Sequence, residues 1–180
     1  IELAGPGGWN VGQVLDDHSD TWSHGVQRYD QVIGCFGDAS IAVQDSGPLQ
    51  VALLVERSFG PNRWQQQIVL RAGERALTIR NWLLWAEPWR IVKLACDVNT
   101  AAPVATHDVP FGAITRPCDG KEVPTHMWMD VSGPAQDVQD GGQTSGQTGV
   151  HTIGLALLND GKYGCDVTGS TQRLTILRCT

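Results

Sequence analysis

Short apolar runs broken by glycine and proline constrain the fold of this chain more than any other feature. The 180 residues include 21 glycines and 9 prolines, and no window keeps a helical period of apolar residues. Residues 49–56 follow a turn at Gly47 and Pro48, and their apolar side chains alternate as in a strand with one buried face. The pattern predicts an all-β protein.

Further strands are predicted wherever branched or aromatic residues lie between turn signals. They are expected at residues 67–71, 77–85, 89–98, 126–131, 151–158 and 173–178. A turn at Glu87 and Pro88 predicts that residues 89–98 form a hairpin with residues 77–85. The even spacing of the strands predicts an antiparallel β-sandwich of two packed sheets. We expect a single domain over residues 1–180, because a chain of this length can bury one sizeable core.

Two connecting segments stand out by composition. Asn159–Lys162 has the residues of a tight hairpin turn between strands. Residues 132–149 are rich in Gly, Gln and Ser and have almost no apolar side chain, so they bury too little surface to offset the entropy of ordering. We predict a flexible surface loop over residues 132–149, with a plain solvated loop favoured over a functional lid.

Charge and cysteine content limit the partners and the compartment. The net charge of −6 and the pI near 5.2 disfavour a nucleic acid or an anionic membrane as partner. The longest apolar runs, such as residues 155–158, are too short to span a bilayer. The five cysteines are odd in number and widely spread. This favours free thiols in a reducing, cytoplasmic compartment, with one or two disulfide bridges left open.

Four blocks of aromatic and charged residues follow one another between residues 81 and 178. They are Trp85–Glu87 with Lys93, Phe111–Gly112 with Arg116–Pro117, Trp128–Ser132, and Gly154–Gly164. In this order they resemble the C-terminal β-domain of glycoside hydrolase family 38 α-mannosidases, and specifically the bacterial and cytosolic branch. Residues 16–25 also fit that branch. The resemblance implies a fold that is part of the large galactose-mutarotase-like supersandwich of the family.

The same resemblance implies a non-catalytic role. The family's nucleophile and metal ligands lie in an N-terminal barrel, and 180 residues that lack an initiator Met are too few to hold that barrel as well. We expect a C-terminal fragment that packs on and completes the barrel of an enzyme hydrolysing α-mannosides with retention. The expected partners are that barrel and a mannose-containing carbohydrate, with a homo-oligomer left open. A divalent metal, usually zinc, is expected in the barrel, whereas no catalytic residue, metal site or cofactor is expected in this chain.

Asp20, Trp22 and His24 are the first candidates for residues that line the substrate or an interface. They lie in a dense polar motif, whose ordinary interpretation is an Asx or ST turn that orders the chain. The functional interpretation is a loop that faces the barrel and lends a hydrogen-bonding group to substrate. His18 and Asp20 also resemble the family's His-x-Asp metal pair, but two ligands do not make a zinc site.

Glu87 and Arg116 are the other candidates. Burial of Glu87 among aromatic residues would raise its pKa towards that of a general acid. Its place before Pro88 and the barrel location of the family's nucleophile favour a structural or interfacial role instead. Pro117 restrains Arg116 to extended geometry, so its guanidinium is aimed at a carboxylate across a domain interface or at a pair of sugar hydroxyls. The interface role is favoured.

Two other classes of function compete with this interpretation. The chain is alternatively a free-standing carbohydrate-binding, lectin-like module that uses Trp85 and Trp89 as a stacking platform. It is otherwise a purely structural domain that mediates oligomer contacts through exposed aromatic residues. The exposure of Trp82, Trp85 and Trp89 separates these hypotheses, because a lectin needs two coplanar rings open to solvent.

Overall fold

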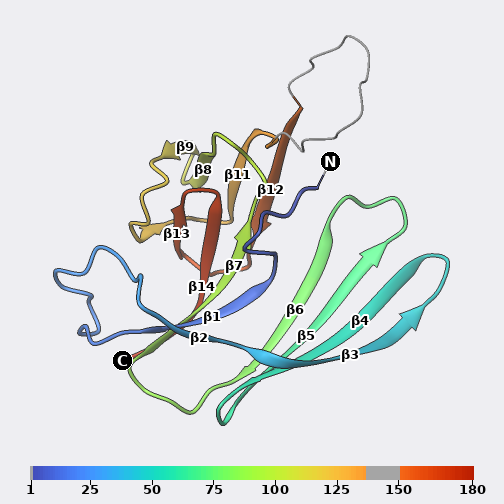
Figure 1. Cartoon of the computed structure of the whole chain (residues 1–180), viewed down its shortest axis with the longest axis horizontal. Coiled ribbons are helices and arrows are strands. Elements are labelled where there is room, and N and C mark those ends of the chain that lie inside the picture. Colours follow the sequence, from blue (N-terminus) through green and yellow to red (C-terminus); the bar gives the residue numbers. More distant parts are fainter. Residues whose placement is uncertain (1, 137–150) are drawn as a thin grey trace. The chain divides into compact units, whose positions relative to one another are not determined.

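The computed structural model describes residues 2–136 and 151–180 of the chain. Within these ranges the protein is all-β and its paired strands are antiparallel, which confirms the predicted fold class. The chain divides into two compact units, Ile1–Ile33 with Trp89–Thr180, and Gly34–Pro88. We call them the first and the second unit (Figure 1). The prediction of one domain over residues 1–180 stays a prediction.

The first unit contains two sheets, apart from Gly34 and Cys35 at the end of one edge strand, which are assigned to the second unit. The six-stranded sheet has the order β10-β13-β14-β7-β1-β2, and the four-stranded sheet has the order β12-β11-β8-β9. The strands of the six-stranded sheet are β1 (Val11–Asp16), β2 (Val32–Cys35), β7 (Arg90–Asp97), β10 (Val123–Pro124), β13 (Gly164–Thr168) and β14 (Thr171–Cys179). The strands of the four-stranded sheet are β8 (Val104–Val109), β9 (Gly112–Arg116), β11 (Trp128–Pro134) and β12 (Thr152–Leu158).

The core of the first unit lies between these two sheets, as in a β-sandwich. Alternation places the core residues: Met129 and Val131 of β11 are fully buried, whereas Trp128 and Asp130 between them are partly exposed. The other members of this cluster are Val98, Ala105, Ile153, Cys165, Val167 and Leu174. Each of these comes from a strand or strand end of one of the two sheets.

The second unit is one antiparallel meander. Its strands are β3 (Gly37–Ser46), β4 (Gln50–Phe59), β5 (Asn62–Arg71) and β6 (Leu77–Leu84), and they lie in chain order. Phe36, Phe59, Trp64 and Trp85 form an aromatic cluster at one end of the sheet, in which the Phe36 and Trp64 rings pack edge to face at 5.2 Å.

The hairpin predicted between residues 77–85 and 89–98 is wrong. Strand β6 pairs with β5, whereas β7 lies between β1 and β14 in the other unit. All residues of β7 after Arg90 are buried. A strand buried on both faces belongs in the middle of a covered sheet, and it cannot be the outer partner of a hairpin.

The two connecting segments also differ from prediction. Ser132–Pro134 belong to β11 and pair with β12, so the strand enters the range predicted as a loop, and residues 137–149 lie outside the described residues. A Cβ on Gly133 would lie 2.3 Å from the Ala102 carbonyl oxygen, so small residues here permit close backbone packing. Asn159–Lys162 does form a turn, with Asn159 Oδ1 accepting from two following amides, but it joins β12 to β13 of the other sheet and makes no hairpin.

Candidate functional site

The loop that leaves β1, Asp17–Gly25, contains three of the five predicted site residues. Arg178, near the end of β14, holds this loop in place. Its Nε donates to Asp17 Oδ2 at 2.7 Å, and its Nη2 donates to Ser19 Oγ at 2.8 Å. Further bonds reach the backbone carbonyls of Asp20 at 2.6 Å and Thr21 at 2.9 Å. We call residues 17–25 the anchored loop.

A β-bulge in β14 aims the Arg178 side chain at the loop. Thr175 pairs with Lys93 of β7, and after the bulge Arg178 pairs with Ile91. Lys93 and Ile91 are two residues apart and share a face, so Thr175 and Arg178 share that face as well. Without the extra residue at Ile176, alternation would turn Arg178 to the opposite side of the sheet.

Asp17 is the buried end of this anchor. Only 2% of the residue is exposed, and its carboxylate also accepts the Ser19 amide at 3.0 Å. Burial alone raises the pKa of Asp17, but the hydrogen bonds from Arg178 and Ser19 outweigh it and hold the pKa below the usual 3.8. The Tyr29 hydroxyl donates to Ser23 Oγ at 2.8 Å. This bond holds the part of the loop around Ser23 against Tyr29.

The anchored loop presents Asp20, Trp22 and His24 to solvent. Asp20 Oδ1 accepts the amides of Trp22 at 3.0 Å and His24 at 3.1 Å, and its Oδ2 lies 2.7 Å from His24 Nδ1. The bonds from His24 lower the pKa of Asp20. Trp22 is 81% exposed. The Asx turn expected from the sequence is therefore present, and contact of these side chains with substrate stays a prediction.

The structure does not bring His18 and Asp20 together as a metal pair. His18 Nε2 lies 2.6 Å from Asp16 Oδ2, and Asp16 also accepts from Arg90 at 2.6 Å. Across residues 2–136 and 151–180, no three His, Cys, Asp or Glu side chains form a group that could hold a metal ion. The metal was expected in the barrel and not in this chain, and that expectation stays a prediction.

Glu87 belongs to the second unit and is part of a turn-linking network. Its carboxylate accepts from Asn62 Nδ2 at 2.6 Å, and Asn62 is fully buried. The same Asn62 donates to the Phe59 carbonyl and accepts the Ala86 amide. Glu87 therefore connects the β4–β5 turn to the end of β6.

Arg116 ends β9 in the first unit and is partly buried. Its Nη1 donates to the carbonyl of Pro124, so the guanidinium already has a partner within the unit. Burial and, secondly, the charge of Arg116 lower the pKa of His107 from 6.5 to about 4. Whether Arg116 also contacts a carboxylate of another domain stays a prediction.

Under the anchored loop lies a buried ionic cluster that sequence reasoning missed. Lys93 and Asp166 have fully buried side chains 2.6 Å apart, and Arg173 Nε donates to the other Asp166 oxygen at 2.8 Å. Lys93 also bonds Glu122, and Arg173 donates to the Tyr29 carbonyl at 3.0 Å. Tyr29 therefore contacts the cluster through its carbonyl and the anchored loop through its hydroxyl.

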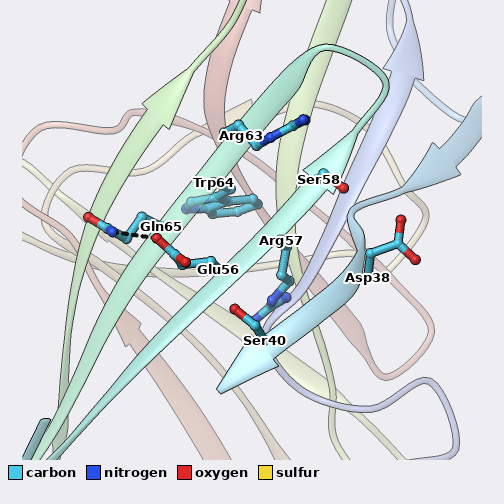
Figure 2. Close-up of a pocket in the computed structure, with 8 residues that line it drawn as sticks. All are labelled: Asp38, Ser40, Glu56, Arg57, Ser58, Arg63, Trp64 and Gln65. Carbon is cyan, nitrogen blue, oxygen red and sulfur yellow. Dashed lines mark hydrogen bonds between the residues drawn. The ribbon is translucent and has the colours of Figure 1, made fainter. Parts of the chain in front are cut away.

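The second unit contains a polar hollow of about 370 Å³ on the β3–β5 strands (Figure 2). Gln65 Nε2 donates to Glu56 Oε1 at 2.8 Å beside it. The hollow is lined by Asp38, Ser40, Glu56, Arg57, Ser58, Arg63, Trp64 and Gln65. Trp64 is only 1% exposed, so its ring offers no face to a ligand there.

Of the three tryptophans whose exposure distinguishes the functional hypotheses, two are exposed and one is partly buried. Trp82 is 51% and Trp89 is 45% exposed. Trp85 is partly buried, and its ring centroid lies 6.3 Å from that of Phe36. Its indole N–H donates to the Glu87 carbonyl. Trp85 is therefore engaged in packing and is not a free half of a stacking platform.

Comparison with known proteins places the chain in a family. Residues 10–180 match the model of the glycosyl hydrolases family 38 C-terminal domain. The chain belongs to this family. It is 29% identical over 179 residues to Alpha-mannosidase 2C1 of Homo sapiens and 27% identical over 179 residues to Alpha-mannosidase 2C1 of Mus musculus, each over 94% of this chain. It is 23% identical over 172 residues, 88% of this chain, to Alpha-mannosidase G of Dictyostelium discoideum.

The match confirms the predicted resemblance to family 38 α-mannosidases. The chain spans about 15% of the length of the two 2C1 relatives. The finer assignment to the bacterial and cytosolic branch stays a prediction. Among the described residues, no helix is long and apolar enough to cross a membrane.

In this family 38 domain, sequence reasoning found the exposed loop residues but missed what holds them. Asp17 and Arg178 are 161 positions apart. Asp17 has a local partner in Ser19, but no local pattern indicates that Arg178 pairs with it. The fold alone brings them together. The local signal was the polar motif of residues 17–25, which predicts an Asx or ST turn but does not show that Asp17 is its buried carboxylate.

Proposed function

We propose that this chain is the non-catalytic C-terminal β-domain of an α-mannosidase-like glycoside hydrolase, which packs on and completes the catalytic barrel that hydrolyses α-mannosides. The family match and the names of the relatives support the type of enzyme. The observation that carries the role of this chain is the anchored loop. Its Trp22 is 81% exposed although the backbone around it is fixed by Arg178.

A loop fixed in this way is suited to line one wall of a sugar site. The Trp22 indole offers an apolar face to the C–H face of a pyranose, and the Asp20 carboxylate with the His24 imidazole offers hydrogen bonds to its hydroxyls. Because the loop is already ordered by buried contacts, little conformational entropy remains to be lost when substrate binds.

The chemistry of bond cleavage belongs, in this proposal, to the barrel. A divalent metal, zinc in most such enzymes, supplies Lewis-acid stabilisation when bound there. The described residues of this chain do not form a ligand set for it, so no step is assigned to them. We place the enzyme in the cytoplasm, with a mannose-containing carbohydrate as substrate.

The test is kinetic and uses the complete polypeptide that carries this domain. Trp22→Ala and Asp20→Ala are each expected to lower kcat/KM for an aryl α-mannoside by about tenfold or more, as loss of a stacking or charged contact does. Phe111→Ala is the matched control, because Phe111, like Trp22, is an exposed aromatic residue of the first unit. Unchanged kinetics in both loop variants would remove the loop from the site, and absence of any α-mannosidase activity would reject the proposal as a whole.

A lectin-like role is the second candidate, and one observation favours it. Trp82 lies in a cross-strand row with Ser40, Glu56 and Gln65, so a half-exposed indole stands beside polar side chains on one face of the sheet. Tryptophan fluorescence titrated with methyl α-mannoside tests it. Saturable quenching that Trp82→Ala abolishes would support binding on this row, and no change at millimolar sugar would reject it.

A further inference from the structure

The sheet of the second unit has one face with two adjacent rows of aliphatic side chains and one face of mixed composition. Strand register places Val43, Leu53, Ile68 and Ile79 in one row that crosses all four strands. The next row, near the start of β4 and the end of β5, contains Val51, Leu70 and Leu77. Residues that are directly opposite in an antiparallel ladder share a face, so these side chains form one continuous surface, which we call the aliphatic face.

The other face of the same sheet mixes polar and apolar side chains. Its rows are Glu56 with Gln65 and Trp82, Leu54 with Gln67 and Arg80, and Ala52 with Val69 and Thr78. Ala52 and Val69 are buried. Arg80 donates to Gln67 at 3.1 Å, and Gln67 donates to Gln44 at 2.6 Å. A sheet face made of aliphatic side chains is normally buried against another layer of structure.

Much of the aliphatic face is open in this chain. Val43 is 67%, Leu77 55%, Leu70 46% and Val51 44% exposed, and Ile41 in the adjoining row is 66% exposed. Isolated exposed aliphatic residues are ordinary, but side chains that share one face of four adjacent strands form a contiguous patch. Burial increases only towards the aromatic cluster, where Val55 is 5% exposed.

The size of the face indicates the kind of partner. Four strands about 4.8 Å apart and three rows of side chains about 6.7 Å apart cover roughly 400 Å². Counting both partners, about 800 Å² would be buried, which lies within the range of contacts between domains of one polypeptide. Stable complexes of separate chains usually bury more, roughly 1,200–2,000 Å². The family relatives supply such a partner, because this chain spans about 15% of their length.

We propose that the aliphatic face docks on the part of the same polypeptide that lies outside this chain, against an uncharged helix or sheet surface of aliphatic side chains. The inference rests on the proposed function, since it takes this chain to be one domain of a larger α-mannosidase. It adds the surface through which the second unit is attached. The aliphatic face, and not the polar hollow on the β3–β5 strands, is the contact.

Thiol footprinting in the complete polypeptide tests this. Val43→Cys and Leu77→Cys place a thiol on the aliphatic face, and Gln44→Cys and Arg80→Cys are matched controls on exposed positions of the same two strands. Labelling with a small maleimide is followed at each position by peptide mass spectrometry, so the native cysteines do not interfere. The thiols at positions 43 and 77 are expected to react at least about tenfold more slowly than those at positions 44 and 80. Equal rates in the complete polypeptide would overturn the proposal.

The 180-residue chain alone provides the second arm. Buried Cys96 must stay unreactive there, which reports that the chain is folded. With the remainder absent, the four introduced thiols are expected to react at rates within about threefold of each other. Slow reaction at positions 43 and 77 in the chain alone would overturn the proposal, and its dependence on concentration would identify a second copy as the occupant. Labelling requires no activity, so protection without α-mannosidase turnover would reject the enzyme assignment and leave the docking face standing.

Discussion

At the scale of single residues, the guanidinium of Arg178 satisfies four acceptors of one loop, among them the buried Asp17 carboxylate. An exposed ion pair contributes little to stability, but removal of one partner of a buried pair leaves an uncompensated charge. The side chain of Asp17 is fully buried, whereas that of Arg178 is 22% exposed. Loss of the pair therefore destabilises the fold mainly by leaving the Asp17 carboxylate buried without a charged partner.

We predict that Arg178→Ala lowers the free energy of unfolding by about 2–4 kcal/mol, because Asp17 then stays buried without its charged partner. Arg178→Lys keeps the charge but loses the planar fork, so it should lose less. Urea unfolding of the three proteins measures the difference. A loss below about 0.5 kcal/mol in the Ala variant, the size of an ordinary surface effect, would show that the anchor does not hold the loop.

His107 makes stability depend on pH. The residue is 1% exposed, and neither ring nitrogen has a hydrogen-bond partner among the described residues. Its folded pKa is lowered to about 4, by burial first and by Arg116 second, from 6.5. Between these two values the unfolded chain binds more protons than the folded one, so stability falls as pH falls from 6.5 to 4.

We predict that His107→Leu removes this contribution, up to about 3 kcal/mol across the window. Urea unfolding at pH 7 and at pH 4.5 in both proteins measures it, with the change between the two pH values compared. Other groups titrate equally in both proteins and cancel in that comparison. The same pH dependence in the variant would show that His107 titrates normally in the fold.

At the scale of elements, residues 132–134 belong to a closely packed strand although their composition predicted a loop, and β14 contains a bulge that the sequence analysis did not predict. In β11, Gly133 passes so close to Ala102 that an added Cβ would lie 2.3 Å from the Ala102 carbonyl oxygen. In β14, one extra residue changes which side chains face the anchored loop. Both features depend on neighbouring strands that are distant in sequence.

We predict that Gly133→Ala destabilises the protein by about 1–3 kcal/mol, because the new methyl group would lie 2.5 Å from Thr100 Oγ1 and 2.3 Å from the Ala102 carbonyl oxygen. Gly112→Ala is the matched control, since an added Cβ there meets nothing within 4 Å. Chemical denaturation of both variants measures the effect. Equal stability of the two variants would place residues 132–134 in an adaptable segment.

At the scale of the whole molecule, the two units differ in how much of their apolar sheet surface is buried. The first unit buries a core between two sheets, and its β7 is buried along almost its whole length. The second unit is a single sheet with an aliphatic face that is largely exposed. A single layer has fewer buried contacts to lose on opening.

We predict that, in the 180-residue chain, the amides of β4 and β5 exchange hydrogen about tenfold or more faster than those of β7 and β14. Both pairs are inner strands of their sheets, so strand position is matched. Hydrogen exchange followed by mass spectrometry measures the rates by peptide. Uniform protection would show that the two units open together.

The all-β class, about half of the strands and the Asp20–His24 turn follow from the sequence alone, because two-residue alternation and Asx turns are set by neighbouring residues. It also carried the family blocks that the comparison bears out. Only the tertiary structure decided that β7 pairs with β1 and β14, that Arg178 reaches Asp17, and that Lys93, Asp166 and Arg173 meet in a buried cluster. These contacts join segments up to 161 positions apart. Many strand pairings satisfy the same local pattern, and the choice among them depends on which faces are buried together.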